Sequence, residues 1–313
     1  MFRSASPLDL DLVLTAHQSD SVPLIEAERF RRELEQRQCR LEWTWLHEAD
    51  GRLLARALWW GPPDSLHPVS LDCLWVHPSV SGPASIASQL VAAGHRALRR
   101  ARLAHLPDMN LKVPIDWRND PGAVCGGAWR IDAVAAAGLT ETIERLSYAW
   151  TPERPKPRRS FRLVFRPADD HGFLGVFAAV AQGSLDILTQ RNLIEMGADA
   201  QAADDLDFYL GLPGERGAWR LAYDHDGALV GFAIPSRSAY DASVSYLGVV
   251  PEHRGRGYVD DLLAEITHVH GDAGALRITG TTDTTNAPLA AAFLRAGYSV
   301  TETRIVIGAP PSP

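Results

Sequence analysis

The chain has 313 residues, of which 46% are hydrophobic, so it can bury either one large core or two cores of ordinary size. Its 31 basic and 38 acidic residues give a formal net charge of -7, which argues against the basic face that nucleic acids select. Aspartates interrupt the N-terminal apolar stretch, and no apolar run approaches the roughly 18 residues of a membrane span, so we expect a cytoplasmic protein with neither nucleic acid nor membrane as a partner.

The first half of the chain begins with a predicted hairpin. In RLEWTWLHEADGRLLARALWWG, two apolar runs flank Asp50-Gly51, a pair that supplies the positive φ of a tight turn. A strand in VSLDCLWVHP, a helix in ASIASQLVAAGHRALRRA and a strand in NLKVPIDW are expected next. The last segment of this half, VAAAGLTETIERLSYAW, closes the series.

A linker separates the two halves. Residues 151–160, TPERPKPRRS, contain three prolines, four basic residues and no apolar side chain, which is typical of an extended, solvated connector. Beyond it we expect a strand at Phe161–Phe165, helices over about 168–182 and 201–210, and a hairpin turning at Asp226-Gly227. The remaining expected elements are a strand in ASVSYLGVV, a helix after a double-glycine turn, a strand in ALRITGT, a helix in APLAAAFLRAG and a strand in SVTETRIVI.

The same order of elements therefore occurs twice. The segment at 134–150, VAAAGLTETIERLSYAW, is similar to the segment at 291–307, AAFLRAGYSVTETRIVI. We predict two tandem copies of one α/β unit, at residues 1–150 and 161–313, each a mixed sheet packed by helices.

The stretch LGVVPEHRGRGYVDDLL, Leu247 to Leu263, carries the clearest functional signal. Gly255 and Gly257 remove Cβ atoms from a turn whose amide groups can then converge, and the helix that follows adds its positive dipole end. This arrangement predicts a pyrophosphate pocket, with Arg254 and Arg256 as charge partners.

This stretch resembles the acyl-CoA signature of the GNAT N-acetyltransferases, a strand and a proline followed by (Q/R)-x-x-G-x-(G/A), with Arg254 in its first place and Gly257 in its fourth. The later TTDTTNAPLAAAFLRAGY resembles the second motif of that family, N-x-x-(A/M) followed by G-(F/Y). The resemblance covers about 155–308, and extends to 1–150 only through the order of elements. The positions that match the second motif are Asn286, Leu289, Gly297 and Tyr298.

The resemblance implies a sheet splayed open between the strands at Ser243–Val250 and Ala275–Thr281, with the pantetheine arm of acetyl-CoA, or of another acyl-CoA, in the gap. The main chain of Leu247 and Val249 would pair with that arm as an added strand does. The cofactor-binding residues implied in this way are Leu247, Gly248, Val249, Arg254, Gly255, Arg256, Gly257, Tyr258, Val259, Asn286 and Phe293.

Two positions depart from the family pattern. Val259 occupies the sixth motif place, where the family has Gly or Ala, although its amide is still available. Phe293 stands where many members carry a tyrosine that protonates the leaving thiolate, so the usual general acid is absent.

The proton acceptor is less evident in the sequence. An alkylammonium with a pKa near 10.4 must lose a proton before it attacks, yet the strand from Ala242 to Val250 carries no carboxylate. Our first candidate is a water held by Ser243, Ser245 and main-chain carbonyls, and our second is Asp241. Serines on a strand are equally often merely solvated.

Two other polar groups have simple structural explanations. Asp204, Asp205 and Asp207 lie where this family roofs the acceptor site, but we favour a solvated helix face over an acidic rim for a cationic amine. His268 and His270 lie near a helix end, whose dipole accounts for them, and we expect no metal site.

The first half lacks the signature. Its sequence HPSVSGPASI places Ser81, Pro83 and Ala84 where the motif needs its two arginines and its fourth-position glycine. Pro83 also removes an amide that a phosphate would use. We expect this half to bind no CoA and to serve as scaffold or as one wall of the acceptor site.

The leading hypothesis is an acyl-CoA-dependent N-acyltransferase, with acetyl-CoA as the first choice of donor, acting by direct attack of a small-molecule primary amine on the thioester. The alternative is a non-catalytic tandem GNAT protein that binds CoA or a small molecule, which Phe293 and the carboxylate-free strand favour. Aminoacyl transfer from tRNA is a third hypothesis, disfavoured by the acidic charge. The sequence indicates no particular oligomeric state.

Overall fold

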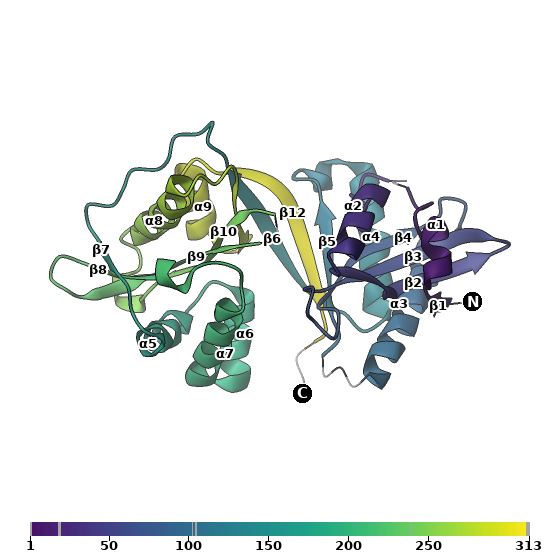
Figure 1. Ribbon diagram of the computed structural model, residues 1–313, viewed down its shortest axis with the longest axis horizontal. Coiled ribbons are helices and arrows are strands. Elements are labelled where there is room, and N and C mark those ends of the chain that lie inside the picture. Colours follow the sequence, from purple (N-terminus) through teal and green to yellow (C-terminus); the bar gives the residue numbers. More distant parts are fainter. Residues whose placement is uncertain (1, 18–19, 102, 104, 239, 311–313) are drawn as a thin grey trace. The chain divides into compact units, whose positions relative to one another are not determined.

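The computed structural model describes residues 2–17, 20–101, 103, 105–238 and 240–310 (Figure 1). The chain folds into two compact units. Unit 1 consists of Met1–Glu144 and Glu302–Pro313, and unit 2 consists of Arg145–Thr301. Both combine helices with a mixed sheet, so the predicted fold class is confirmed.

Unit 1 contains a sheet in the order β1-β2-β3-β4-β5-β12, in which β4 and β5 are parallel. Its helices and strands are β1 (Phe2–Ser4), α1 (Leu10–Val13), α2 (Ala27–Glu35), β2 (Cys39–Ala49), β3 (Arg52–Trp60), β4 (Ser70–Val76), α3 (Pro83–Arg100), β5 (Asp108–Val113), α4 (Pro121–Ala136) and part of β12 (Ser299–Gly308).

Unit 2 contains a sheet in the order β6-β11-β10-β9-β8-β7, in which β10 and β11 are parallel. Its helices and strands are part of β6 (Glu141–Trp150), then β7 (Val164–Arg166), α5 (Asp170–Ala181), α6 (Ile187–Met196), α7 (Ala198–Leu210), β8 (Arg220–Tyr223), β9 (Leu229–Arg237), β10 (Ala242–Val249), α8 (Tyr258–Asp272), β11 (Ile278–Asp283) and α9 (Ala287–Arg295).

The two units repeat one order of strands, with hairpins at the two predicted Asp-Gly turns. Each sheet is completed by a strand from the other half of the sequence: residues 145–150 of β6 pair with β11, and residues 303–307 of β12 pair with β5. The two compact units therefore end at different residues from the two sequence repeats. The division into a first repeat at 1–150, a linker at 151–160 and a second repeat at 161–313 remains a prediction.

Two differences between the expected elements and the structure lie near the site of unit 2. The strand expected at Phe161–Phe165 lies at β7, slightly later in the chain. The region before residue 210 forms two helices, α6 and α7, where one was expected. Asp186 starts α6 by accepting a hydrogen bond from the Thr189 amide (2.9 Å), and Gly197, with φ of 82°, separates the two helices.

The helices of unit 2 cover both faces of its sheet (Figure 1). One cluster of buried side chains joins α8 and α9 to the sheet through Leu263, Ile266 and Phe293. A second cluster joins α5 and α7 to the sheet through Phe177 and Leu206. Within the described residues, no helix has both the length and the apolar character that crossing a membrane requires.

Two glycines allow close packing around β10. A Cβ atom at Gly231 would lie 2.1 Å from the Gly248 carbonyl oxygen on the neighbouring strand. A Cβ atom at Gly248 would lie 2.3 Å from Val180 Cγ1 of α5. The sheet and α5 therefore meet at a distance that only glycine permits.

We expect Gly231→Ala to lower the free energy of unfolding by about 1–3 kcal/mol, because the methyl group meets main-chain atoms that cannot rotate away. The matched control is Gly175→Ala in α5, where a Cβ atom meets no described atom within 4 Å and helix propensity favours alanine by about 0.5–1 kcal/mol. Urea unfolding of both variants measures the difference. Equal stability of the two variants would contradict this account of the packing.

Candidate active site

The sheet of unit 2 is open between its two parallel strands. β10 pairs with β11 only at Ala242 with Ile278 and at Ser243 with Thr279. Beyond these pairs a cavity of ≈ 740 Å³ is lined from one side by β10 residues and from the other by Thr281 and Thr282 of β11. The splayed sheet expected from the family resemblance is present.

The edge of β10 that faces this gap is formed by main-chain groups. The Val250 N–H donates to the Val230 carbonyl (2.9 Å), which directs that residue toward β9. Since alternate residues of a strand turn their N–H and C=O groups to opposite edges, Leu247 and Val249 direct theirs toward the gap. The Val249 carbonyl accepts a hydrogen bond from Arg254 Nε (3.0 Å), consistent with this direction.

A β-bulge lies in the middle of the cavity wall. The register between β10 and β9 shifts between Val244 and Tyr246, so Ser245 is the extra residue. Its Oγ is hydrogen-bonded to Ser236 Oγ of β9. A bulge of this kind bends its strand and increases the local twist.

The double-glycine turn has the backbone conformation of an anion-binding loop. Gly255 and Gly257 have φ of 75° and 76°, and a Cβ atom at either would meet no described atom closer than 3.9 Å. Glycine is therefore required here by the backbone rather than by protein side chains. Gly257 caps α8, whose first N–H groups have no intrahelical acceptor and can bind an anion.

An arginine that sequence reasoning missed stabilises this turn from outside the cavity. Arg162 donates from Nη1 to the Arg256 carbonyl (2.9 Å) and from Nη2 to the Gly257 carbonyl (3.2 Å). It also pairs with Asp261, and its guanidinium lies 4.6 Å from the centre of the Tyr258 ring. No motif position indicated this role, because Arg162 comes from the segment before β7.

Arg254 lines the cavity, but it mainly bonds to the main chain. Its Nη1 donates to the carbonyls of Gln182 (2.6 Å) and Gly183 (2.9 Å), and its Nη2 donates to the Val180 carbonyl (2.7 Å). Together with its bond to Val249, these contacts fasten the C-terminal end of α5 to the end of β10 and leave one guanidinium N–H. Arg256, the other expected charge partner, is exposed and does not line the cavity.

The second motif supplies the opposite wall. Asn286 caps α9 by accepting from the Leu289 amide (3.4 Å). Phe293 is 1% exposed and stacks on Tyr148 of β6, with ring centroids 4.5 Å apart. The other expected cofactor-binding residues that line the cavity are Leu247, Gly248, Val249, Gly255, Gly257, Tyr258 and Val259.

Of the three expected catalytic residues, Ser245 lines the cavity, whereas Ser243 and Asp241 do not. The Ser243 carbonyl is bonded to His270 Nε2 (2.9 Å), and Asp241 pairs with Arg277 (3.0 Å). The described residues contain no group of three or more His, Cys, Asp or Glu side chains that could hold a metal ion.

Helix α7 contributes polar side chains to the cavity that the sequence analysis did not assign to the site. The α7 residues that line the cavity have the spacing i, i+3, i+4, i+7 and i+8, which places them on one face of the helix. Asp207 is exposed and lies outside the lining. The α7 lining residues, called here the α7 face, are Gln201, Asp204, Asp205, Phe208 and Tyr209.

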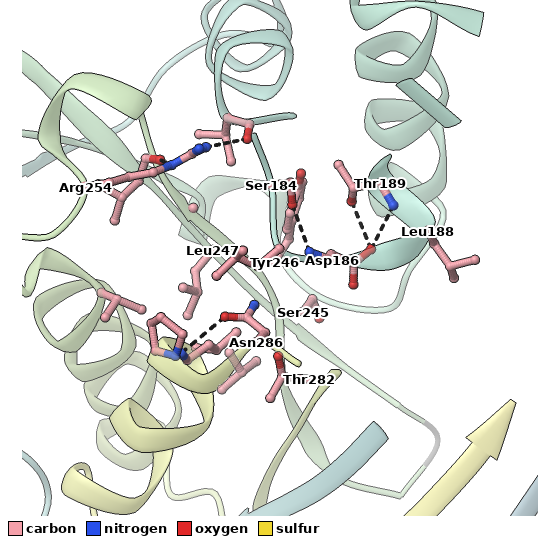
Figure 2. A pocket seen from close by; sticks show the side chains of 18 of the residues that line it. Ser184, Asp186, Leu188, Thr189, Ser245, Tyr246, Leu247, Arg254, Thr282 and Asn286 are labelled. Atoms are coloured by element: carbon pink, nitrogen blue, oxygen red, sulfur yellow. Dashed lines mark hydrogen bonds between the residues drawn. The ribbon is translucent and has the colours of Figure 1, made fainter. Parts of the chain in front are cut away.

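The start of α6 is bound to the sheet by an ionic network. Asp283 of β11, only 1% exposed, pairs with Arg145 of β6 (2.8 Å) and accepts from the Ile187 amide (2.8 Å). Arg145 also pairs with Asp186 (2.9 Å), while burial raises the pKa of Asp283. Figure 2 shows Asp186 with its hydrogen bonds to Ser184 and Thr189 on one wall of the cavity and Asn286 on another.

Asp205 differs from these paired carboxylates, because it has no hydrogen bond or ion pair with the described residues. Burial, followed by the negative charges of Asp204 and Asp186, raises its pKa to about 6. Nearby, Tyr209 stacks on Tyr246 with ring centroids 4.9 Å apart, and burial raises the pKa of both phenols. A half-buried carboxylate with this pKa can accept a proton at neutral pH.

At the corresponding strand edge of unit 1, one main-chain carbonyl is already bonded. Arg130, 3% exposed, donates from Nε to the Leu74 carbonyl of β4 (2.9 Å) and from Nη1 to Asp20 (2.8 Å). The Trp75 indole donates to the His17 carbonyl (2.9 Å). The Leu74 carbonyl, which an added strand would use, is therefore already bonded within unit 1.

Comparison with known proteins gives one family and one fold. The model of the acetyltransferase (GNAT) family matches residues 188–298. No curated protein matches the chain. A GCN5-related N-acetyltransferase from Sphaerobacter thermophilus has a similar structure, with a TM-score of 0.58 and 19% identity, over 98% of this chain and 94% of that one.

A glucosamine N-acetyltransferase region of a fungal multi-domain β-N-acetylglucosaminidase also shares the fold, with a TM-score of 0.55 and 14% identity. The similarity covers 98% of this chain and 38% of that one. A tandem GNAT protein from the clavulanic acid biosynthesis pathway matches over 100% of this chain and 99% of its own, with a TM-score of 0.48 and 15% identity. Residues 188–298 therefore match the acetyltransferase (GNAT) family, and the chain shares its fold with a GCN5-related N-acetyltransferase.

Proposed function

We propose that unit 2 is an acyl-CoA-dependent N-acyltransferase that acylates a primary amine of a small molecule, with acetyl-CoA as the first candidate for the acyl donor. One observation carries this proposal. One cavity of unit 2 contains the open edge of β10, the double-glycine turn at the N-terminus of α8, and Asp205. This carboxylate is half buried and has no hydrogen bond or ion pair with the described residues.

The residues present fit a CoA thioester. The turn at Gly255 and Gly257 and the first amides of α8 suit a pyrophosphate, and the edge at Leu247 and Val249 suits the amides of a pantetheine arm. When bound, the acyl-CoA supplies the thioester carbonyl that the amine attacks. An N–H of the β10 edge would polarise that carbonyl oxygen as charge develops on it.

Asp205 is the best candidate for the proton acceptor in this proposal, in place of the water at Ser243 and of Asp241. It lies in the cavity with a pKa of about 6, so it is mostly ionised at neutral pH. Ser245, at the bulge of β10, would orient the amine or a bridging water. Phe293 cannot donate a proton, but a thiol with a pKa of about 8.5 leaves adequately as its anion.

A non-catalytic CoA-binding protein is the second candidate, because Phe293 replaces the usual acid. Release of free thiol from acetyl-CoA across a panel of primary amines separates the two candidates. Thiol release that depends on the amine supports the enzyme, whereas CoA binding without release supports the binding protein.

We expect a titration with CoA to find one site per chain, because unit 1 lacks the double-glycine turn and Arg130 bonds to the Leu74 carbonyl of its strand edge. Gly257→Ala should weaken CoA binding by about tenfold, since an L-residue at this φ costs about 1–2 kcal/mol and favours a relaxed turn whose amide groups no longer converge. Isothermal titration calorimetry measures both quantities.

The matched control for that variant is Gly274→Ala, which introduces the same strain (φ of 80°) after α8 and away from the cavity. Its CoA affinity should equal that of the wild type. A stoichiometry of two, or equal losses of affinity in both variants, would contradict the assignment of the CoA site.

Asp205→Asn should lower kcat/KM by roughly 100-fold, because it removes the proton acceptor. In the wild type, kcat/KM should fall as the pH drops through about 6, because Asp205 becomes protonated there. This fall adds to the steady decrease in kcat/KM that protonation of the substrate amine causes. The variant should lack this bend. The pH–rate profiles of the two proteins test the prediction, and a bend at pH 6 that persists in the variant would refute it.

Stability gives an independent readout for the same variant. The pKa of Asp205 is raised above its unfolded value of 3.8 to about 6, so folding favours the protonated form. The contribution of protonated Asp205 to the free energy of unfolding is complete below pH 3.8 and is lost as the pH rises through about 6. Asp205→Asn should therefore melt higher than the wild type at pH 8, and a loss of activity could not be attributed to unfolding.

A further inference from the structure

Four carboxylates and one guanidinium lie in or beside the part of the cavity next to α6 and α7. One bound ammonium group would leave most of the remaining negative charge unbalanced. Asp186 and Asp283 share the single guanidinium of Arg145. Asp204 and Asp205 have no hydrogen bond or ion pair with any residue that the structure describes. Carboxylates brought together without cations repel each other, and this repulsion is relieved when a ligand supplies the positive charge.

A buried polar atom on the same helix face supports a ligand site. Gln201 is 1% exposed and lines the cavity, and its Oε1 has no hydrogen-bond partner among the described residues. Buried side-chain acceptors are normally bonded, because an unbonded one loses its hydration without compensation. Gln201 lies one helical turn from Asp204 and Asp205. Its unbonded Oε1 and the two carboxylates therefore lie on the same side of the helix, the α7 face.

The chemistry of acyl transfer requires the two carboxylates to have different functions. The attacking nitrogen must be uncharged, so its attraction to a carboxylate disappears once it gives up its proton. Asp205 takes this first proton and passes it to water. The nitrogen then forms the C–N bond as the C–S bond breaks, the thiolate leaves, and the second N–H proton goes to the regenerated Asp205 carboxylate or to water. A substrate held through these steps by charge therefore needs another cation.

We propose that the acceptor is a dicationic amine, whose reacting nitrogen lies at Asp205 while its second ammonium group is bound by Asp204 and Gln201. This inference rests on the proposed function of unit 2. Asp204 is exposed at the rim of the cavity, where a distal charge would lie, and Asp205 is half buried. The rings of Tyr209 and Tyr246 provide an apolar surface for the carbon chain between the two nitrogens.

The test uses primary amines of equal length that differ only at the far end: 1,4-diaminobutane, 4-aminobutan-1-ol, pentylamine and 4-aminobutanoate. With saturating acetyl-CoA, the diamine should have a kcat/KM at least about tenfold above that of the alcohol, because a charge-assisted bond replaces a neutral one. The carboxylate should be the poorest substrate. Equal rates for the diamine and the alcohol would overturn the proposal.

Asp204→Asn should remove the preference for the diamine through KM. Because it also removes a charge that raises the pKa of Asp205, kcat for the diamine and kcat for the alcohol should change by the same factor. The matched control is Asp207→Asn, which removes the same charge from the exposed part of the same helix and should keep the full preference. Equal effects of the two variants would mean that general helix charge, not a subsite, determines the preference, and would overturn the proposal.

A binding experiment separates this inference from the proposed function. Calorimetric titration of 1,4-diaminobutane into the protein saturated with CoA should show one site that Asp204→Asn weakens and Asp207→Asn does not. Such binding without thiol release would refute the enzyme and retain the dication site. Thiol release with amines but no preference for the diamine would refute the dication site and retain the enzyme.

Discussion

The candidate site depends on one constraint, the early end of the parallel pairing between β10 and β11. Two residue pairs join these strands, and beyond them the edge of β10 that points away from β9 lines a cavity. Three features keep the gap from closing. The bulge at Ser245 bends β10, Gly248 admits Val180 of α5 against its other face, and Arg254 fastens the end of α5 to the end of β10.

Charge is distributed unevenly along this cavity. At one end, the N-terminus of α8 and the remaining N–H of Arg254 favour an anion. At the other end, Asp204, Asp205 and the network around Arg145 favour a cation. The cavity can therefore receive an anionic donor and a cationic acceptor from opposite ends, with the reacting groups meeting near the bulge of β10.

Local signals in the sequence predicted the hairpins, the repeated order of elements and the double-glycine turn, because each depends on neighbouring residues. The bonding of Arg254 could not be predicted, since its partners are main-chain carbonyls at the end of α5. Arg162 was missed for the same reason. The spacing of Gln201, Asp204 and Asp205 was visible, but only the fold shows that this side of α7 faces the cavity and that Asp207 does not.

Hydrogen exchange of the main-chain amides tests the central claim most directly, because the claim concerns an open strand edge. Adding CoA should slow exchange at Leu247 and Val249 and at the first residues of α8, and should leave β4 of unit 1 unchanged. Protection that appears along β4, or none along β10 at a saturating concentration of CoA, would contradict the account.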